Sequence, residues 1–214
     1  MEDLIKKVVE EVLKEAKKID DSKSNDNLIP IEASAKHVHL SQKDVEALFG
    51  AGHQLTFDRE LSQPGQFLAK ERVMLIGPKG VIERVAVLGP ARDQTQVEIS
   101  ITDSRVLGLE AKLRESGQLE GTKGIVISGN GNVVKALNGV IAAKRHIHMT
   151  SKDAEKLNVK DKQIVSVKVY SDRPVILEDV VVRVNDNYAL AMHIDFDEAN
   201  ACALTKGVKG EIVC

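Results

Sequence analysis

Aromatic residues are scarce in this chain. They make up 3% of the 214 residues, and tryptophan is absent. Aliphatic side chains must therefore fill the interior, which suits small, tightly packed β-rich units. The only cysteines, Cys202 and Cys214, cannot supply a disulfide framework. This excludes a disulfide-stapled secreted domain and favours a reducing intracellular setting.

Long apolar runs and an excess of positive charge are also missing. No segment approaches the roughly 20 apolar residues that a membrane-spanning helix needs. The N-terminus lacks the apolar region and cleavage site of a secretory signal. The formal net charge is −2, whereas a general nucleic-acid binder usually carries a basic stripe. We therefore expect neither a membrane nor a nucleic acid as a partner.

Histidine, in contrast, is concentrated in a short sequence motif that occurs twice. The first copy is KHVHLS at residues 36–41, and the second is RHIHMT at residues 145–150. Four of the six histidines lie in these two His-x-His pairs. Their spacing is too long for a solenoid repeat and indicates two related domains of about 100 residues each.

A His-x-His pair on a strand presents two imidazoles on one face, where both can bind one metal ion such as Zn²⁺. The alternative for a single pair is two ordinary surface or core histidines. The repetition of the pair in equivalent frames favours the metal. Each pair needs a further ligand, and we expect Glu98 to serve His37 and His39. His193 is the candidate for His146 and His148.

Three protein ligands leave one zinc position open, which is the pattern of a catalytic site. Arg92 follows a Gly-Pro break and precedes Glu98 closely, so it is suited to hold an anion such as phosphate. A surface salt bridge is an equally good interpretation of this arginine. The residues thus indicate a paired-metal enzyme for an anionic substrate, and they leave the reaction open.

The local patterns predict a mainly β chain with short helices. Turn signals indicate hairpins at residues 73–88, 125–135 and 180–194. Ser41 and Thr150 each fit the N-cap of a short helix, and another short helix is expected after Asp195. We predict two tandem, related small β-barrel domains, at residues 28–122 and 123–214. Residues 208–213 could close the second sheet.

Residues 1–19 have the apolar spacing of an amphipathic helix, and a polar linker follows to residue 27. The helix could fold back onto the body or dock in a groove of another protein. It could also promote assembly into a homo-oligomer.

The chain resembles the PduL-type phosphate acyltransferases, or phosphate propanoyltransferases, over about residues 29–214. Four phrases carry the resemblance in order: KHVHLS at 36–41, LGPAR at 88–92 with TQVEIS at 95–100, RHIHMT at 145–150, and MHID at 192–195 with DEANA at 197–201. The chain departs from the family pattern at Ala35-Lys36, where Asn-Arg is common, and at Phe196, where a small polar residue is usual.

The resemblance implies two β-barrel domains with the active site between them, and reversible transfer of a propanoyl or acetyl group between coenzyme A and inorganic phosphate. It implies two zinc ions per chain. The implied ligands are His37, His39 and Glu98 for one ion and His146, His148 and His193 for the other. It also implies that Arg92 binds phosphate, and that Gln66 and Asn200 help line the phosphate or coenzyme A pocket.

In relatives from bacterial microcompartments, a helix such as residues 1–19 acts as an encapsulation peptide that docks on shell proteins. The resemblance therefore implies a location in a microcompartment lumen. A metal-dependent hydrolase is the main enzymatic rival, although the His-x-His-x-Asp-His phrase of metallo-β-lactamases is absent. A cupin-type oxygenase and a non-enzymatic metal-binding scaffold of the microcompartment are two further rivals.

Overall fold

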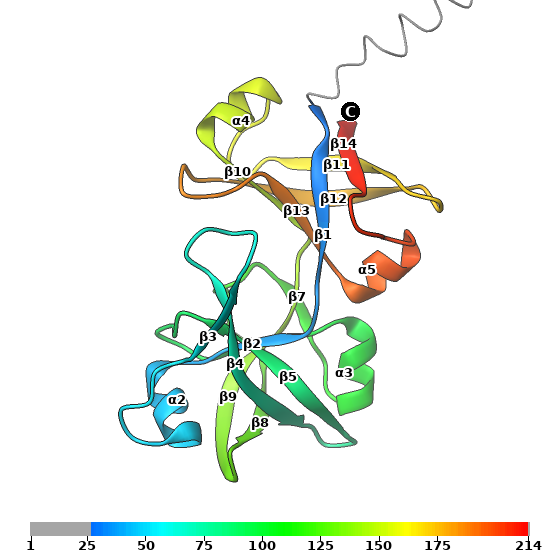
Figure 1. Ribbon diagram of the computed structural model, residues 1–214. Coiled ribbons are helices and arrows are strands. Elements are labelled where there is room, and N and C mark those ends of the chain that lie inside the picture. The colour runs from blue at the N-terminus through cyan, green and yellow to red at the C-terminus, as the bar shows by residue number, and fades with distance from the viewer. Residues whose placement is uncertain (1–26, 214) are drawn as a thin grey trace, which may run out of the picture.

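Two closed six-stranded β-barrels make up the computed structural model, which describes residues 27–213 (Figure 1). This confirms the predicted fold class. The helix expected at residues 1–19 lies outside the described residues. No helix within residues 27–213 has the length and apolarity needed to cross a bilayer.

The first barrel closes through antiparallel and parallel pairs of six strands. In ring order these are β4 (Phe67–Ile76), β5 (Val81–Gly89), β2 (His37–His39), β6 (Gln96–Glu98), β9 (Asn132–Ala143) and β8 (Lys123–Gly129). Two further strands extend its edges: β3 (Phe57–Glu60) pairs with β4, and β7 (Lys112–Arg114) pairs with β9.

The second barrel follows the same plan. In ring order it contains β1 (Ile29–Ser34), β13 (Ala191–Asp195), β10 (His146–Met149), β12 (Val175–Val184), β11 (Ile164–Tyr170) and β14 (Lys209–Val213). Strand β14 pairs with both β1 and β11 and so closes the ring, as the sequence predicted.

Each barrel contains one strand that leads directly into the other barrel. Strand β1 lies in the second barrel, and the chain then crosses to β2 in the first barrel (Figure 1). Conversely, β9 lies in the first barrel and continues into β10 in the second. The two barrels are therefore joined by a reciprocal exchange of strands, and each His-x-His strand begins just after a crossing.

This exchange divides the chain differently from the expected boundary between residues 122 and 123. Strands β8 and β9 belong to the first barrel, although they follow that point, and β1 belongs to the second, although it opens the first repeat. The hairpins at residues 73–88 and 125–135 are confirmed. The third predicted hairpin is wrong, because β10 lies between β12 and β13 and pairs with both.

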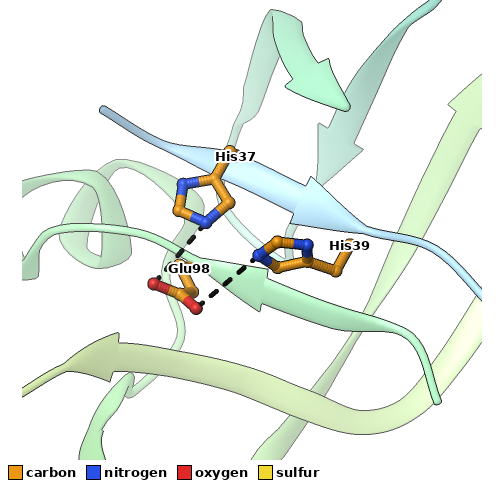
Figure 2. A group of neighbouring side chains, drawn as sticks. All are labelled: His37, His39 and Glu98. Atoms are coloured by element: carbon orange, nitrogen blue, oxygen red, sulfur yellow. Dashed lines mark ion pairs between the residues drawn. The ribbon is translucent and has the colours of Figure 1, made fainter. Parts of the chain in front are cut away.

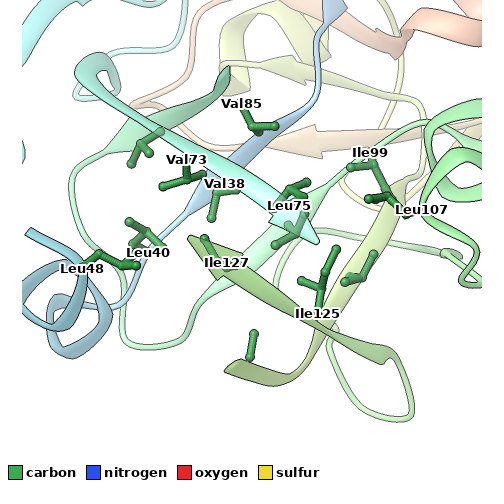
Figure 3. Close-up of a cluster of buried hydrophobic side chains, with 14 of the residues drawn as sticks. Val38, Leu40, Leu48, Val73, Leu75, Val85, Ile99, Leu107, Ile125 and Ile127 are labelled. Atoms are coloured by element: carbon green, nitrogen blue, oxygen red, sulfur yellow. The ribbon is translucent and has the colours of Figure 1, made fainter. Parts of the chain in front are cut away.

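Each barrel has an aliphatic core, and Figure 3 shows the core of the first barrel. Val38 pairs in register with Val87 and Val97, and Val97 pairs with Val140; all four are fully buried. Because side chains alternate along a strand, the flanking histidines of β2 must point out of the barrel. The same alternation around the buried Ile147 turns His146 and His148 outward in the second barrel.

Short capped helices follow the strands that carry the candidate ligands. Helix α2 (Gln42–Phe49) follows β2, and α4 (Ser151–Lys156) follows β10, with the predicted caps Ser41 and Thr150 confirmed. Helices α3 (Ile101–Leu107) and α5 (Phe196–Ala201) follow β6 and β13 in the same manner. A complete capping box, in which cap and third residue bond reciprocally, is present in α3, α4 and α5.

Candidate functional site

A cavity of about 560 Å³ is lined by residues of both barrels. Its walls include the outward faces of β2, β6, β10 and β13. All six candidate ligands and Arg92 line it: His37, His39, Glu98, His146, His148 and His193. The structure therefore brings both predicted ligand sets to one space.

The first set converges closely (Figure 2). His37 and Glu98 are direct partners across β2 and β6, and their Nε2 and Oε2 atoms are 3.5 Å apart. His39 Nε2 lies 4.0 Å from the other carboxylate oxygen. One atom from each side chain falls within 4.8 Å of the others, and no other group of His, Cys, Asp or Glu converges in this way in residues 27–213.

Surrounding hydrogen bonds fix these side chains. His37 Nδ1 lies 2.7 Å from the carbonyl oxygen of Ala35, which leaves Nε2 facing the carboxylate. Gln96 Nε2 donates to Glu98 Oε1 at 2.6 Å. Gln96 is itself held, because its Oε1 accepts from the backbone N–H of Gly117 at 2.7 Å. Such outer contacts orient metal ligands in many proteins.

Burial and mutual charge set the protonation states of this set. Burial, together with the charges of the neighbouring His37 and Arg92, lowers the pKa of His39 to about 3. Burial also opposes the charged form of His37, but the Glu98 carboxylate outweighs it and raises the pKa of His37. Burial alone would raise the pKa of Glu98, yet His37 and His39 hold it far below its usual range. The set therefore offers a carboxylate and at least one neutral imidazole.

The second set is made of three histidines. His146 and His193 are direct partners across β10 and β13, and their ring centroids are 5.4 Å apart. The His148 centroid lies 4.7 Å from that of His146 and 5.1 Å from that of His193. His146 repeats the geometry of His37, because its Nδ1 lies 2.7 Å from the carbonyl oxygen of Lys144.

These three imidazoles are neutral at pH 7. Burial lowers the pKa of His148 to about 2 and that of His193 to about 4. Burial also lowers the pKa of His146, and the charge of Arg183 acts in the same direction on all three. Neutral imidazole is the form that ligates a metal.

Both sets fit a metal ion by their donor chemistry. Two imidazoles with a carboxylate, and three imidazoles, are ligand sets of catalytic zinc sites. The Nδ1 atoms of His39 and His148 are buried without a hydrogen-bond partner, and Nε2 of His37 and His146 is left for a ligand by the bond at Nδ1. The first set is the more closely gathered of the two.

Arg92 and Arg183 are two of the four arginines in the cavity wall, and both lie beside candidate ligands. Arg92 Nη2 lies 2.9 Å from His39 Nε2, and Nη1 donates to the Ser116 hydroxyl at 3.1 Å. Because guanidinium can only donate, His39 Nε2 must accept this bond. Arg183 stands beside His148 in the register of β10 and β12 and also lines the cavity. Burial lowers the pKa of Arg92, and Arg183 lowers it further, so the two charges lie within electrostatic reach of each other.

The remaining predicted residues are placed differently. Gln66 lines the cavity from the loop between β3 and β4. Asn200 is an exposed residue of α5 and does not belong to the cavity wall.

The sequence interpretation missed several wall residues. Arg183, Gln63, Ser116 and Tyr188 line the cavity, and the Tyr188 ring lies 4.3 Å from that of His148. Arg183 could have been found, because it lies in a predicted strand that is otherwise rich in valine. Gln63 and Ser116 lie in loops without a distinctive pattern, so their placement depends on the tertiary fold.

Paired barrels with metal-type ligand sets facing a shared cavity are the features of an enzyme, and comparisons with known proteins specify the class. The family model for phosphate propanoyltransferase matches residues 30–205. The chain therefore belongs to the phosphate propanoyltransferase family, and it is an acyltransferase.

Curated relatives with this name match over almost the whole chain. The phosphate propanoyltransferase of Clostridioides difficile is 53% identical over 213 residues, which cover 100% of this chain and 99% of the relative. That of Enterococcus faecalis is 51% identical and covers 99% of this chain and 98% of the relative. That of Thermotoga maritima is 56% identical, with 84% and 86% covered.

Proposed function

We propose that this chain transfers a short acyl group, propanoyl or acetyl, reversibly between coenzyme A and inorganic phosphate, with two zinc ions bound in the cavity. The observation that carries the proposal is Arg92 beside the His37, His39 and Glu98 set. An anion-binding guanidinium and a metal-type ligand set line the same cavity. The name of the relatives, which states both phosphate and an acyl group, supports this assignment.

His37, His39 and Glu98 would hold one ion, and His146, His148 and His193 the other. The bound ions would supply Lewis-acid polarisation of the thioester carbonyl and charge stabilisation at the leaving sulfur. The chain's own residues do the positioning. Arg92 and Arg183 bind phosphate oxygens and hold the nucleophile against the carbonyl, so that proximity supplies much of the acceleration. Direct attack by phosphate requires no serine or cysteine nucleophile.

Ser116 and Gln96 keep Arg92 and Glu98 in register. Ser116 Oγ accepts from both the Arg92 guanidinium and the Gln96 amide, at 3.1 and 2.8 Å. The Gln96 amide also donates to Glu98. One hydrogen-bonded chain thus connects the anion-binding group to a candidate metal ligand, and this fixes the distance between them.

The test is an assay of acyl-coenzyme A with phosphate that follows both thiol release and acyl phosphate, with and without a zinc chelator. We expect both products in equal amounts, and loss of both after chelation. Thiol release with free acid instead of acyl phosphate would establish the hydrolase. Zinc binding without thiol release would establish the non-enzymatic scaffold.

The proposed location is a microcompartment lumen, reached through residues 1–19. The amphipathic spacing of these residues supports it. Fusion of residues 1–27 to a fluorescent protein, expressed with shell proteins, should give foci, while a version with aspartate at Val8 and Val12 should stay diffuse. Diffuse fluorescence of the unaltered fusion would contradict the assignment.

A further inference from the structure

The loop between β3 and β4 of the first barrel reaches across to the second barrel. In Figure 1 the cyan loop beside β3 rises toward β13. Its Ser62 hydroxyl donates to Glu32 on β1 at 2.5 Å. Gln63, which is only 5% exposed, bonds to the backbone of Ala189 just before β13. These bonds attach the loop to β1, which pairs with β13, and to the segment just before β13, the strand that carries His193.

The backbone of Ala189 fixes the orientation of the Gln63 amide. Gln63 Nε2 donates to the Ala189 carbonyl oxygen at 3.0 Å, and Oε1 accepts from the Ala189 N–H at 3.3 Å. The flipped amide would set two oxygens against each other and two N–H groups against each other. The nitrogen that lies 3.4 Å from His193 Nε2 is therefore the amide nitrogen of Gln63.

This orientation determines the tautomer of His193. An amide nitrogen can only donate, so His193 Nε2 must be the unprotonated nitrogen that accepts. The proton of the neutral ring then resides on Nδ1. Glu32 is the direct neighbour of His193 in the register of β1 and β13, and its Oε2 lies 4.0 Å from that Nδ1. This distance exceeds a hydrogen bond, but the negative charge favours a proton on the facing nitrogen.

Two other candidate ligands obtain the same tautomer from their own strand. His37 and His146 each lie next to the carbonyl oxygen two residues earlier, at Ala35 and Lys144. His193 is in mid-strand, and no carbonyl bond to its ring is present in the described residues. The other barrel supplies Gln63 in its place.

We propose that Gln63 is a positioning residue that holds His193 in the Nδ1–H tautomer and so prepares its Nε2 lone pair for a metal ion. This rests on the proposed second metal set. A metal ion and the Gln63 proton use the same lone pair, so metal binding replaces the 3.4 Å bond. The shorter bond to Ala189 keeps the amide paired. The contact that Gln63 makes from the first barrel to the second is thereby coupled to metal binding at His193.

The first test needs no metal and no activity. Nitrogen-15 NMR of the histidine rings in the metal-free full chain at pH 7 distinguishes the two tautomers. We expect His193 to be mainly Nδ1–H in the wild type, and Gln63→Met, which keeps the length but loses the donor, to shift it toward Nε2–H. Gln94→Met, which removes an exposed amide bonded to Asn138, is the matched control. A wild-type His193 in the Nε2–H form, or a tautomer that Gln63→Met leaves unchanged, would overturn the proposal.

The second test measures zinc affinity by competition with a chelator. Because zinc must displace the Gln63 bond at His193 Nε2, and such a bond has a modest net value, Gln63→Met should bind zinc at one of two sites about two- to tenfold more tightly, with the other unchanged. Equal or weaker zinc binding in the variant would contradict the proposal. A wild type that binds a single zinc ion would refute the second metal set instead, and the tautomer result would still stand. If Gln63→Met does not fold, the wild-type spectrum and Glu32→Gln decide the question.

Discussion

At the scale of single residues, the site depends on side chains that a neighbour holds in one protonation state. Arg92 can only donate, and so His39 accepts; the carbonyl oxygens of Ala35 and Lys144 leave Nε2 of His37 and His146 open. A small shift of any such partner changes which ring nitrogen carries a lone pair. The cavity is therefore sensitive to substitutions at residues that are not themselves ligands.

Arg92→Ala should reduce turnover by 100- to 1000-fold, because the loss of one preorganised donor to a developing charge typically costs this much. Zinc content should stay the same, since Arg92 is not a candidate ligand. The measurement is kcat with acyl-coenzyme A and phosphate, alongside elemental analysis. Arg173→Ala, at an exposed arginine, serves as the control. Turnover within threefold of wild type in Arg92→Ala would refute the anion-binding role.

Arg183→Ala should act mainly on substrate binding. A charge-assisted bond to an anion is worth about 1.5–3 kcal/mol, so we expect the KM for phosphate or for acyl-coenzyme A to rise at least about tenfold, with a smaller change in kcat. Steady-state kinetics with each substrate varied in turn identifies the affected one. Unchanged KM values for both substrates would exclude Arg183 from anion binding.

The sequence predicted the residue-scale site in part. Two His-x-His pairs on strands are a local pattern, and period-two alternation correctly placed Glu98 on the face of its strand that lines the cavity. Gln63 and Arg183 escaped this reasoning, because they face the site only through strand pairing and a long loop. Gln66 lines the cavity, whereas Asn200 is exposed on α5 outside its wall, and the substrate-binding role that the resemblance implies for Asn200 stays a prediction.

At the scale of elements, the repeated unit is a strand that carries candidate ligands, followed by a capped helix. Strands β2, β6, β10 and β13 all end this way. The basic residue before each His-x-His pair bonds to the helix after the partner strand: Lys36 to Asp103 and Arg145 to Glu198, both at 2.9 Å. These equivalent contacts fix each crossing segment relative to the helix beside it.

Thr150→Ala should lower the free energy of unfolding by about 1 kcal/mol, the typical cost of removing a helix N-cap. Thr150 Oγ1 accepts from the Asp153 N–H, and it also donates to the Asp153 carboxylate. Urea unfolding followed by circular dichroism measures the change. Ser151→Ala, one residue on, should stay within about 0.5 kcal/mol of wild type. Equal destabilisation by the two substitutions would refute the cap.

Turn and cap signals in the sequence predict where most helices and strands form, but they do not predict which strands pair. The residues at 180–194 look like a hairpin because two strand-like runs flank Asn185-Asp186-Asn187. Strands β12 and β13 instead each pair with β10, which lies between them and buries Ile147 between Val182 and Met192. Burial of such aliphatic side chains is worth about 1.5–3 kcal/mol each, and this tertiary gain determined the order of strands.

At the scale of the whole molecule, neither barrel is contiguous in sequence. The fragments 27–131 and 132–214 should each fail to fold alone, because each would lack one strand of its barrel and leave an open, apolar edge. Mixed together, they should recover the circular dichroism spectrum and some activity. A cooperatively folded monomer of either fragment would contradict the exchange of strands.

Acid should destabilise the metal-free protein well above the pH at which carboxylates protonate. His148, His39 and His193 have folded pKa values of about 2, 3 and 4, against about 6.5 when unfolded. Between these limits the unfolded chain binds more protons, so stability rises with pH and is lost on acidification. Each histidine contributes a slope of about 1.4 kcal/mol per pH unit.

Urea unfolding between pH 7.5 and pH 5 tests this expectation. We expect stability to fall steadily below about pH 6.5, where the three depressed histidines dominate, and to decline gently as pH rises above 6.5, because the pKa of His37 is raised in the folded state. The variant His148→Gln should show a shallower fall, because one of the neutral rings is gone. A flat profile between pH 7 and pH 5 would refute the buried neutral histidines.

The exchange of β1 and β9 also has a consequence for the ancestry of the chain. A single repeat of this kind could complete a barrel only by lending its first strand to a second copy and borrowing that copy's strand in return. An ancestor encoded by half of the present sequence would thus have been an intertwined homodimer with two identical ligand sets. Fusion of two such copies would have allowed the halves to diverge, so that one set contains a carboxylate, Glu98, at the place where the other contains His193.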